Sequence, residues 1–172
     1  MLDKELFRKT EGKLYRYYRF KREIESITNR IECLETRLKT IESDIKTTNV
    51  TIDYYQNGIG ISERVQTSSK GTSYAEEEII KEIGKLEREH CNKTKQLMKA
   101  RVKLRDMEEF TSYMEFNINM LNEEDKRFIE LKYGDEINMP EVATRLNISQ
   151  ATAYRKREEL VKNIAQFESV IK

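Results

Sequence analysis

The stretch of sequence that decides the fold is IESITNRIECLETRLKTIESDI, which runs from Ile24 to Ile45. Apolar residues recur in it at alternating spacings of three and four, and the positions between them carry mainly Arg, Glu, Lys and Thr. This is the pattern of a helix that packs along one seam, whereas a β-strand would need alternation by two. The pattern predicts a long helix over about residues 13–54. Its seam comprises Ile24, Ile27, Ile31, Leu34, Leu38, Ile41 and Ile45.

A second run of the same kind begins at Ile79 and ends at Ile118. It predicts another long helix, over about residues 75–118, although a few polar residues weaken its seam. Residues 56–73 between the two runs are rich in Gly, Ser and Thr, as loops are. Two helices of similar length joined by one loop are expected to fold back as an antiparallel hairpin. Because such a hairpin buries only one seam on each helix, we also expect it to form a homo-oligomer.

Composition is consistent with long helices and argues against several functional classes. Charged and hydrophobic residues each make up 37% of the 172 residues, and the chain has one Pro and no Trp. The two cysteines, Cys33 and Cys91, have no CxxC partner, which excludes a zinc finger built on cysteine pairs. The single histidine, His90, supports neither a metal site nor a His-dependent nucleophile. No apolar run approaches membrane-spanning length. We therefore expect a cytoplasmic all-α protein that is not an enzyme and has no metal, cofactor or membrane contact.

After residue 118 the heptads stop, and shorter signals predict three helices within residues 119–172. The first ends at Gly134, a residue common after helix ends. Asn138 is a good N-cap for the second, and Pro140 then falls in the first turn, where its missing N–H costs little. The third begins at Gln150. The predicted inward-facing residues are Leu121, Phe128, Ile129, Leu131, Tyr133, Val142, Ala143, Leu146, Ala153, Leu160 and Ile164.

The segment MPEVATRLNISQATAYRKREEL, residues 139–160, has the layout of a helix-turn-helix. Ala143 and Ala153 are small, as residues must be where two helices cross closely. Asn147 tolerates the left-handed backbone that a tight turn requires. Ser149 can cap the following helix. The chain is thus expected to comprise a coiled-coil hairpin over residues 1–118 and a DNA-binding domain over residues 119–172.

In a helix-turn-helix, the N-terminal part of the second helix enters the major groove of double-stranded DNA. Gln can pair with adenine, Arg with guanine, and an Ala methyl can meet the methyl of thymine. The predicted base-contacting residues are Gln150, Ala151, Tyr154 and Arg155. Residues that contact phosphates position the protein without reading sequence, and those predicted here are Ser149, Thr152 and Lys156.

Charge weighs against DNA binding by this region. Residues 120–172 contain nine Lys or Arg and ten Asp or Glu, whereas neutralisation of phosphates normally supplies much of the affinity for DNA. The consecutive cations Arg155, Lys156 and Arg157 nevertheless concentrate positive charge where the groove would lie. We therefore expect a monomer to bind weakly and a dimer or a partner protein to strengthen binding.

The segment LNEEDKRFIELKYGDEINMPEVATRLNISQATAYRKREEL, residues 121–160, resembles region four of bacterial sigma factors. It is more similar to phage and prophage transcriptional regulators of the ArpU and RinA type. Their recognition helix typically reads S-x-x-T-x-Y-R-x-K/R, which is matched by Ser149, Thr152, Tyr154, Arg155 and Arg157. The resemblance implies a regulator of phage transcription in a bacterial host cell, with RNA polymerase as a further partner. Because no equivalent of sigma region two is present, it implies an activator, or a partial sigma-like factor, rather than a complete sigma factor.

Three alternatives stay open at the level of sequence. A small terminase-like subunit of a phage packaging machine would also combine a helix-turn-helix with helical oligomerisation. A structural coiled-coil adaptor would need no DNA. The basic and aromatic segment KLYRYYRFKR, residues 13–22, could contact nucleic acid, but we favour the interpretation that Leu14 and either Tyr17 or Tyr18 continue the helical seam.

Overall fold

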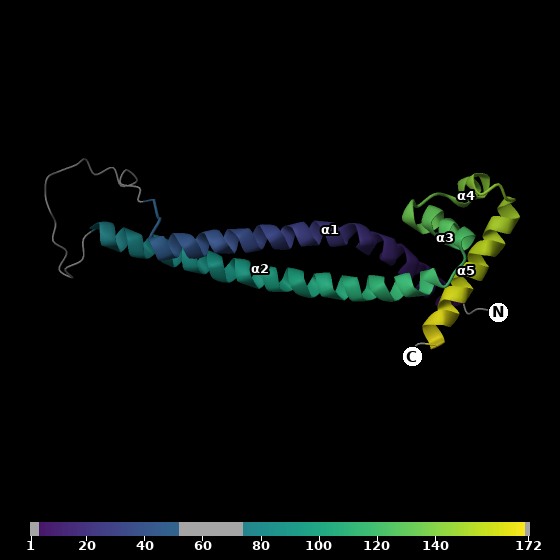
Figure 1. Ribbon diagram of the computed structural model, residues 1–172, viewed down its shortest axis with the longest axis horizontal. Helices are drawn as coiled ribbons and strands as arrows, with labels where there is room; N and C mark the ends of the chain where they lie inside the picture. The colour runs from purple at the N-terminus through teal and green to yellow at the C-terminus, as the bar shows by residue number, and fades with distance from the viewer. Residues whose placement is uncertain (1–3, 52–73, 171–172) are drawn as a thin grey trace. The chain divides into compact units, whose positions relative to one another are not determined.

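The protein is all-α in the computed structural model, which describes residues 4–51 and 74–170. Two long helices, α1 (Lys4–Thr47) and α2 (Tyr74–Asn119), run side by side in opposite directions (Figure 1). Three further helices follow and pack together: α3 (Glu123–Ile129), which continues into the single π-helical turn η1 (Glu130–Gly134), α4 (Met139–Arg145) and α5 (Gln150–Val170). The predicted fold class, hairpin and three C-terminal helices are confirmed. The predicted loop 56–73 lies outside the described residues.

Helix α1 ends at Thr47, earlier than the predicted residue 54. Thr48 adopts the left-handed conformation, with φ 53°. The Asn49 N–H then donates to the carbonyl of Asp44 at 2.9 Å, and the Thr48 N–H donates to that of Ile45 at 3.3 Å, which is the Schellman pattern of a helix end. The stop coincides with a run of Thr, Asn and Val, residues that favour helices weakly. The apolar pattern alone did not reveal it.

The two predicted seams are confirmed along their whole described length. Every seam position from Ile24 to Ile45 and from Ile79 to Ile118 is buried or half-buried, including the polar positions of the second run. Cys33 and Cys91 lie off the seams, and both are exposed free thiols. Among the described residues, no helix is long and apolar enough to cross a membrane.

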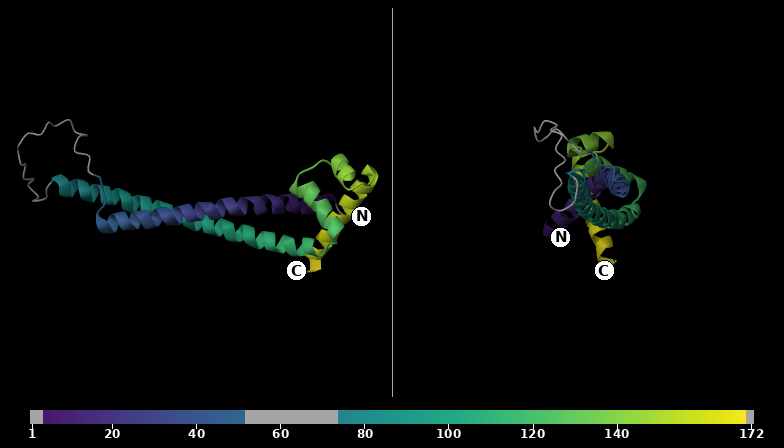
Figure 2. Two further views of the ribbon diagram at one scale, coloured as in Figure 1. Left: turned by 45° about the horizontal axis from the view of Figure 1, so that its top comes forward. Right: turned by 90° about the vertical axis from the view of Figure 1, so that its left-hand side faces the viewer.

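The contacts of the chain divide it into two compact units. The hairpin unit comprises residues Asn29–Val102, and the composite unit combines Met1–Thr28 with Lys103–Lys172. The composite unit therefore contains the beginning of α1 and the end of α2 as well as the three C-terminal helices. Figure 2 shows the same helices from two further directions.

Ion pairs between the helices accompany the apolar seam of the hairpin unit. Nε and Nη2 of Arg37 donate hydrogen bonds to the two carboxylate oxygens of Glu89, each with a length of 3.0 Å. This hydrogen bonding raises the pKa of Arg37 and is the main cause of the lowered pKa of Glu89. Arg101 donates to Glu35 at 2.6 Å. Because each pair joins α1 to α2, the pairs favour one register of the hairpin.

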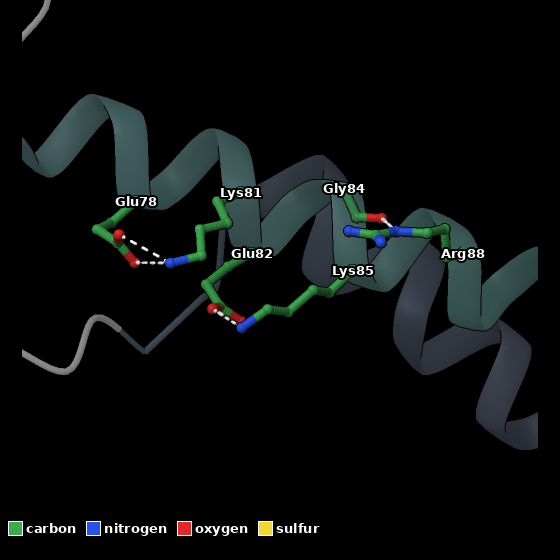
Figure 3. Close-up of polar contacts among 6 residues, drawn as sticks. All are labelled: Glu78, Lys81, Glu82, Gly84, Lys85 and Arg88. Carbon is green, nitrogen blue, oxygen red and sulfur yellow. Dashed lines mark hydrogen bonds and ion pairs between the residues drawn. The ribbon is translucent and has the colours of Figure 1, made fainter. Parts of the chain in front are cut away.

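The first turns of α2 are stabilised by contacts within the helix itself (Figure 3). Lys81 lies 3.1 Å from the carboxylate of Glu78, and Lys85 pairs with Glu82 in the same i, i+3 arrangement. Such pairs contribute a few tenths of a kcal/mol each to an isolated helix. They support helical structure in a stretch of α2 whose side chains are less buried than those nearer its end.

The composite unit has one core, to which all six elements contribute. Leu14 and Tyr17 from α1 and Met114 and Ile118 from α2 are buried together with residues of the C-terminal helices. The C-terminal contribution includes the predicted inward-facing residues Leu121, Phe128, Ile129, Tyr133, Val142, Ala143, Ala153, Leu160 and Ile164. Leu131, Leu146 and Ile148 pack against this core and are partly buried. The helix-turn-helix thus shares its core with the long hairpin helices.

Candidate nucleic-acid interface

The turn between α4 and α5 has the backbone that the sequence predicts. Asn147 is left-handed, with φ 54°. The Ile148 N–H donates to the carbonyl of Ala143 at 3.0 Å, and the Asn147 N–H donates to that of Thr144 at 3.2 Å. These two bonds form a complete Schellman motif with Asn at the left-handed position. They fix the direction in which the chain enters α5.

Side-chain caps define the beginnings of both helices. The Glu141 N–H donates to Asn138 Oδ1 at 2.9 Å, which confirms the predicted cap of α4. At the start of α5, the Thr152 N–H donates to Ser149 Oγ at 3.1 Å, and the two hydroxyls lie 2.8 Å apart. An N-cap of this kind is worth about 1 kcal/mol. Ser149 and Thr152 therefore organise the N-terminus of the helix whether or not they contact a phosphate.

The four predicted base-contacting residues share an exposed face of α5. Gln150, Ala151, Tyr154 and Arg155 are all exposed, and residues four apart on a helix lie on the same side. Tyr154 retains 47% of its surface, although it is a large aromatic residue. The opposite face of α5 is buried through Ala153, Leu160 and Ile164. The sequence thus divides α5 into a core face and a free face.

Lys156 differs from these residues because it is paired within the protein. Its Nζ lies 2.8 Å from Asp125 and 3.9 Å from Glu124, both in α3. The ammonium is thereby held against the start of α3, and only 26% of the side chain is exposed. Its predicted role as a phosphate contact stays a prediction, since DNA would have to compete with two carboxylates for it.

Arg157 is paired as well. Its Nε lies 3.0 Å from Glu11 in α1, and its guanidinium stacks 5.3 Å from the centre of the Phe7 ring. Of the three consecutive cations that the sequence places on the groove side, two are therefore balanced by contacts inside the composite unit. No hydrogen bond or ion pair joins Arg155 to another described residue, so its charge is available for a ligand.

The segment of α1 around Tyr15 to Tyr18 is packed, as the favoured structural interpretation holds, but its partners include the C-terminal helices. Tyr15 contacts the ring of Tyr133 edge-on, with ring centres 4.9 Å apart. Tyr17 is buried, and burial is the main cause of its raised pKa. Burial also raises the pKa of Tyr18, whose ring lies against Gly134. The sequence predicted burial of this segment but not its partners.

Gly134 has a different role from the one that the sequence suggested. The left-handed residue that follows the helix is Glu136, with φ 57°, and not Gly134. A Cβ at position 134 would lie 3.0 Å from Tyr18 Cε1. The Gly134 carbonyl in turn accepts a hydrogen bond of 2.8 Å from Arg22. Glycine is needed here because α1 approaches closely, which local sequence does not indicate.

No group of three or more His, Cys, Asp or Glu side chains that could hold a metal ion occurs among the described residues. His90 lies 3.2 Å from Glu42 across the hairpin, as a polar residue on a seam can. No protein-family model, no curated protein and no solved structure matches the chain.

Proposed function

We propose that this chain is a sequence-specific DNA-binding transcriptional regulator that acts through α4 and α5. One observation carries the proposal: the start of α5 follows a tight Asn147 turn and presents Gln150, Ala151, Tyr154 and Arg155 to solvent. That is the surface which a helix-turn-helix inserts into the major groove. Had this face been packed against the hairpin helices, the proposal would have no basis.

The resemblance to phage and prophage regulators of the ArpU and RinA type supports a role at phage promoters in a bacterial cytoplasm. It also supports contact with RNA polymerase and the role of an activator. In this proposal, α5 reads the promoter, and the hairpin links the DNA-binding surface to other proteins.

The proposal includes self-association through the hairpin. Met98 and Val102 are exposed and lie one turn apart on α2, and Ile80, five turns before Met98, lies on the same side. Ile80 retains 65% of its surface. The adjacent exposed apolar side chains of Met98 and Val102, on an otherwise charged surface of α2, favour contact with a second copy. The mass of the full chain in solution tests this, and a monomer at all concentrations would exclude it.

The function is tested by selecting bound fragments from the source genome with the full chain, then measuring binding to the selected duplex. Arg155→Ala should relax base preference at one position, at a cost of roughly 1–3 kcal/mol if a bidentate contact with guanine is lost. Arg105→Ala, which removes the same charge from an exposed position on α2, is the matched control. If selection yields no preferred sequence, or if Arg155→Ala leaves the preference unchanged, the assignment of α5 as the reading helix fails.

A further inference from the structure

We propose that the first turns of α1 belong to the DNA-binding surface and hold backbone phosphates beside α5. This inference rests on the proposed function and extends it to a segment that precedes α5 by well over a hundred residues. It would make DNA a ligand of both ends of the described chain.

An open cleft of about 890 Å³ lies between the beginning of α1 and α5, within the composite unit. Its cationic lining comes from both helices: Lys4 and Arg8 from α1, and Arg155, Arg157 and Lys162 from α5. On α5, Arg155 and Lys162 are seven positions apart and therefore lie on one side of the helix. The cleft is therefore bordered by positive charge on both sides.

Most of these cations have no partner in the part of the chain that the structure describes. No ion pair or hydrogen bond joins Lys4, Arg8, Arg155 or Lys162 to another described residue, and all four are exposed. Most other basic residues of the composite unit are paired, as Lys9 is with Glu5 at 2.7 Å. Unpaired cations that face each other across an open cleft repel one another. An anion between them would relieve that repulsion.

Three carboxylates also line the cleft, but they do not cancel this charge. Glu11 is held by Arg157 at 3.0 Å and accepts a hydrogen bond from Tyr133 at 3.0 Å, so its charge is already balanced. Glu158 and Glu159 remain on α5. Four unpaired cations therefore stand against two unpaired carboxylates. This excess of positive charge favours the binding of a polyanion in the cleft.

Arg155 connects the cleft to the base-reading face. It lines the cleft and also belongs to the exposed face with Gln150 and Tyr154. When a recognition helix enters the major groove, the backbone strands that border the groove lie beside it, each bearing one phosphate per about 3.4 Å of DNA helix axis. A strand alongside Arg155 would have its next phosphates within reach of the cleft. We therefore take the occupant to be DNA backbone.

This surface also accounts for the unfavourable charge of the C-terminal region. Counted over residues 120–172, acids outnumber bases by one. The first turns of α1 supply the missing cations at the point where α5 needs them. The sequence does not indicate this contribution, because Lys4 and Arg8 lie in the part of the chain that was assigned to the hairpin.

The test uses the full chain and two duplexes, the selected site and a scrambled sequence of the same composition. The variant Lys4→Ala with Arg8→Ala removes two charges from the cleft. Lys95→Ala with Lys99→Ala removes two charges from exposed positions of the hairpin unit and is the control. Two lost phosphate contacts should lower the slope of log affinity against log salt by about two. The loss of affinity relative to the unmodified chain should then be roughly tenfold greater at ~50 mM than at ~200 mM salt.

Both duplexes should be affected equally, because phosphate contacts carry no sequence information. Lys162→Ala, on the α5 side of the cleft, should lower the slope by about one. This variant tests the inference if the double variant does not fold. If the unmodified chain shows no salt-dependent binding to either duplex, the proposed function itself fails. If that chain binds with a steep salt slope and the cleft variants keep the slope, only the present inference is overturned.

Discussion

The phenol of Tyr133 donates a hydrogen bond of 3.0 Å to the carboxylate of Glu11, which lies 122 positions earlier in the chain. The same carboxylate lies 3.0 Å from Nε of Arg157. One side chain of α1 thus contacts both η1 and α5. Because Glu11 is only 20% exposed, these contacts are shielded from solvent more than those of a surface ion pair.

Replacing Glu11 should loosen the composite unit. Glu11→Ala leaves the Tyr133 hydroxyl without its acceptor and Arg157 without its counter-charge, at an expected cost of about 1–3 kcal/mol in the free energy of unfolding. Glu25→Ala, at an exposed position of the same helix, is the control. Urea unfolding of the full chain measures both. Equal midpoints for the two variants would mean that the Glu11 contacts contribute nothing measurable.

Alkaline pH should destabilise the composite unit through Tyr133. Burial, and secondarily the charge of Glu11, raise the pKa of Tyr133 above its ordinary value of 10.0. The unfolded chain therefore releases this proton at a lower pH than the folded chain does. The stabilising contribution is fully present below pH 10 and declines as the pH rises beyond it, by about 1.4 kcal/mol per pH unit.

The measurement is the difference in unfolding free energy between the unmodified chain and Tyr133→Phe, from about pH 8 to about pH 11. The advantage of the unmodified chain should shrink above pH 10. Tyr154→Phe, which changes an exposed ring, is the control. A difference that stays constant across this range would contradict the prediction.

Two Gly→Ala substitutions should have opposite effects. Gly134→Ala places a methyl group 3.0 Å from Tyr18 Cε1, and the crowding should destabilise the chain by about 1–3 kcal/mol. Gly12→Ala meets nothing within 4 Å and should stabilise α1 by up to about 1 kcal/mol. Thermal unfolding distinguishes them. If both substitutions changed the stability in the same direction, helix propensity and not the approach of Tyr18 would determine the effect at position 134.

A double-mutant cycle should separate the structural and DNA-binding roles of Lys156. Its ion pair with Asp125 spans 2.8 Å, and both side chains are mostly buried, so we expect a coupling energy of about 1 kcal/mol for Lys156→Ala and Asp125→Ala. The salt slope of DNA binding is then measured for Lys156→Ala. An unchanged slope would assign Lys156 to the fold alone. A slope lowered by about one would assign it a phosphate as well.

Patterns that act within a few residues could be predicted from the sequence. The seams around Leu34 and Leu97 follow from helical period, because burial repeats where the pattern does. The Asn147 turn and the Ser149 cap follow from the local chemistry of left-handed backbone and helix ends. These features position α5, and they therefore determine where the exposed Tyr154 and Arg155 lie.

Features that depend on distant partners could not be predicted in this way. Nothing near Gly134 in the sequence indicates that Tyr18 will lie against it. Likewise, the residues near Lys156 and Arg157 do not indicate that these cations will form ion pairs with Asp125 and Glu11. The positive charge on α5 was therefore overestimated from sequence. The contribution of α1 to the same core was missed for the same reason, since heptad spacing specifies a face and not its partner.

The shared core also affects how the chain must fold as it is made. Leu14 is synthesised well before Leu160, a member of the same core, which emerges from the ribosome roughly 7–30 s later at ~5–20 residues per second. During that delay the core residues of α1 lack the part of their core that α5 provides. Closing a core between residues so far apart in the sequence also slows folding, because a long loop must close before its contacts can form. The nascent protein is therefore most open to chaperones, and to aggregation, until α5 is complete.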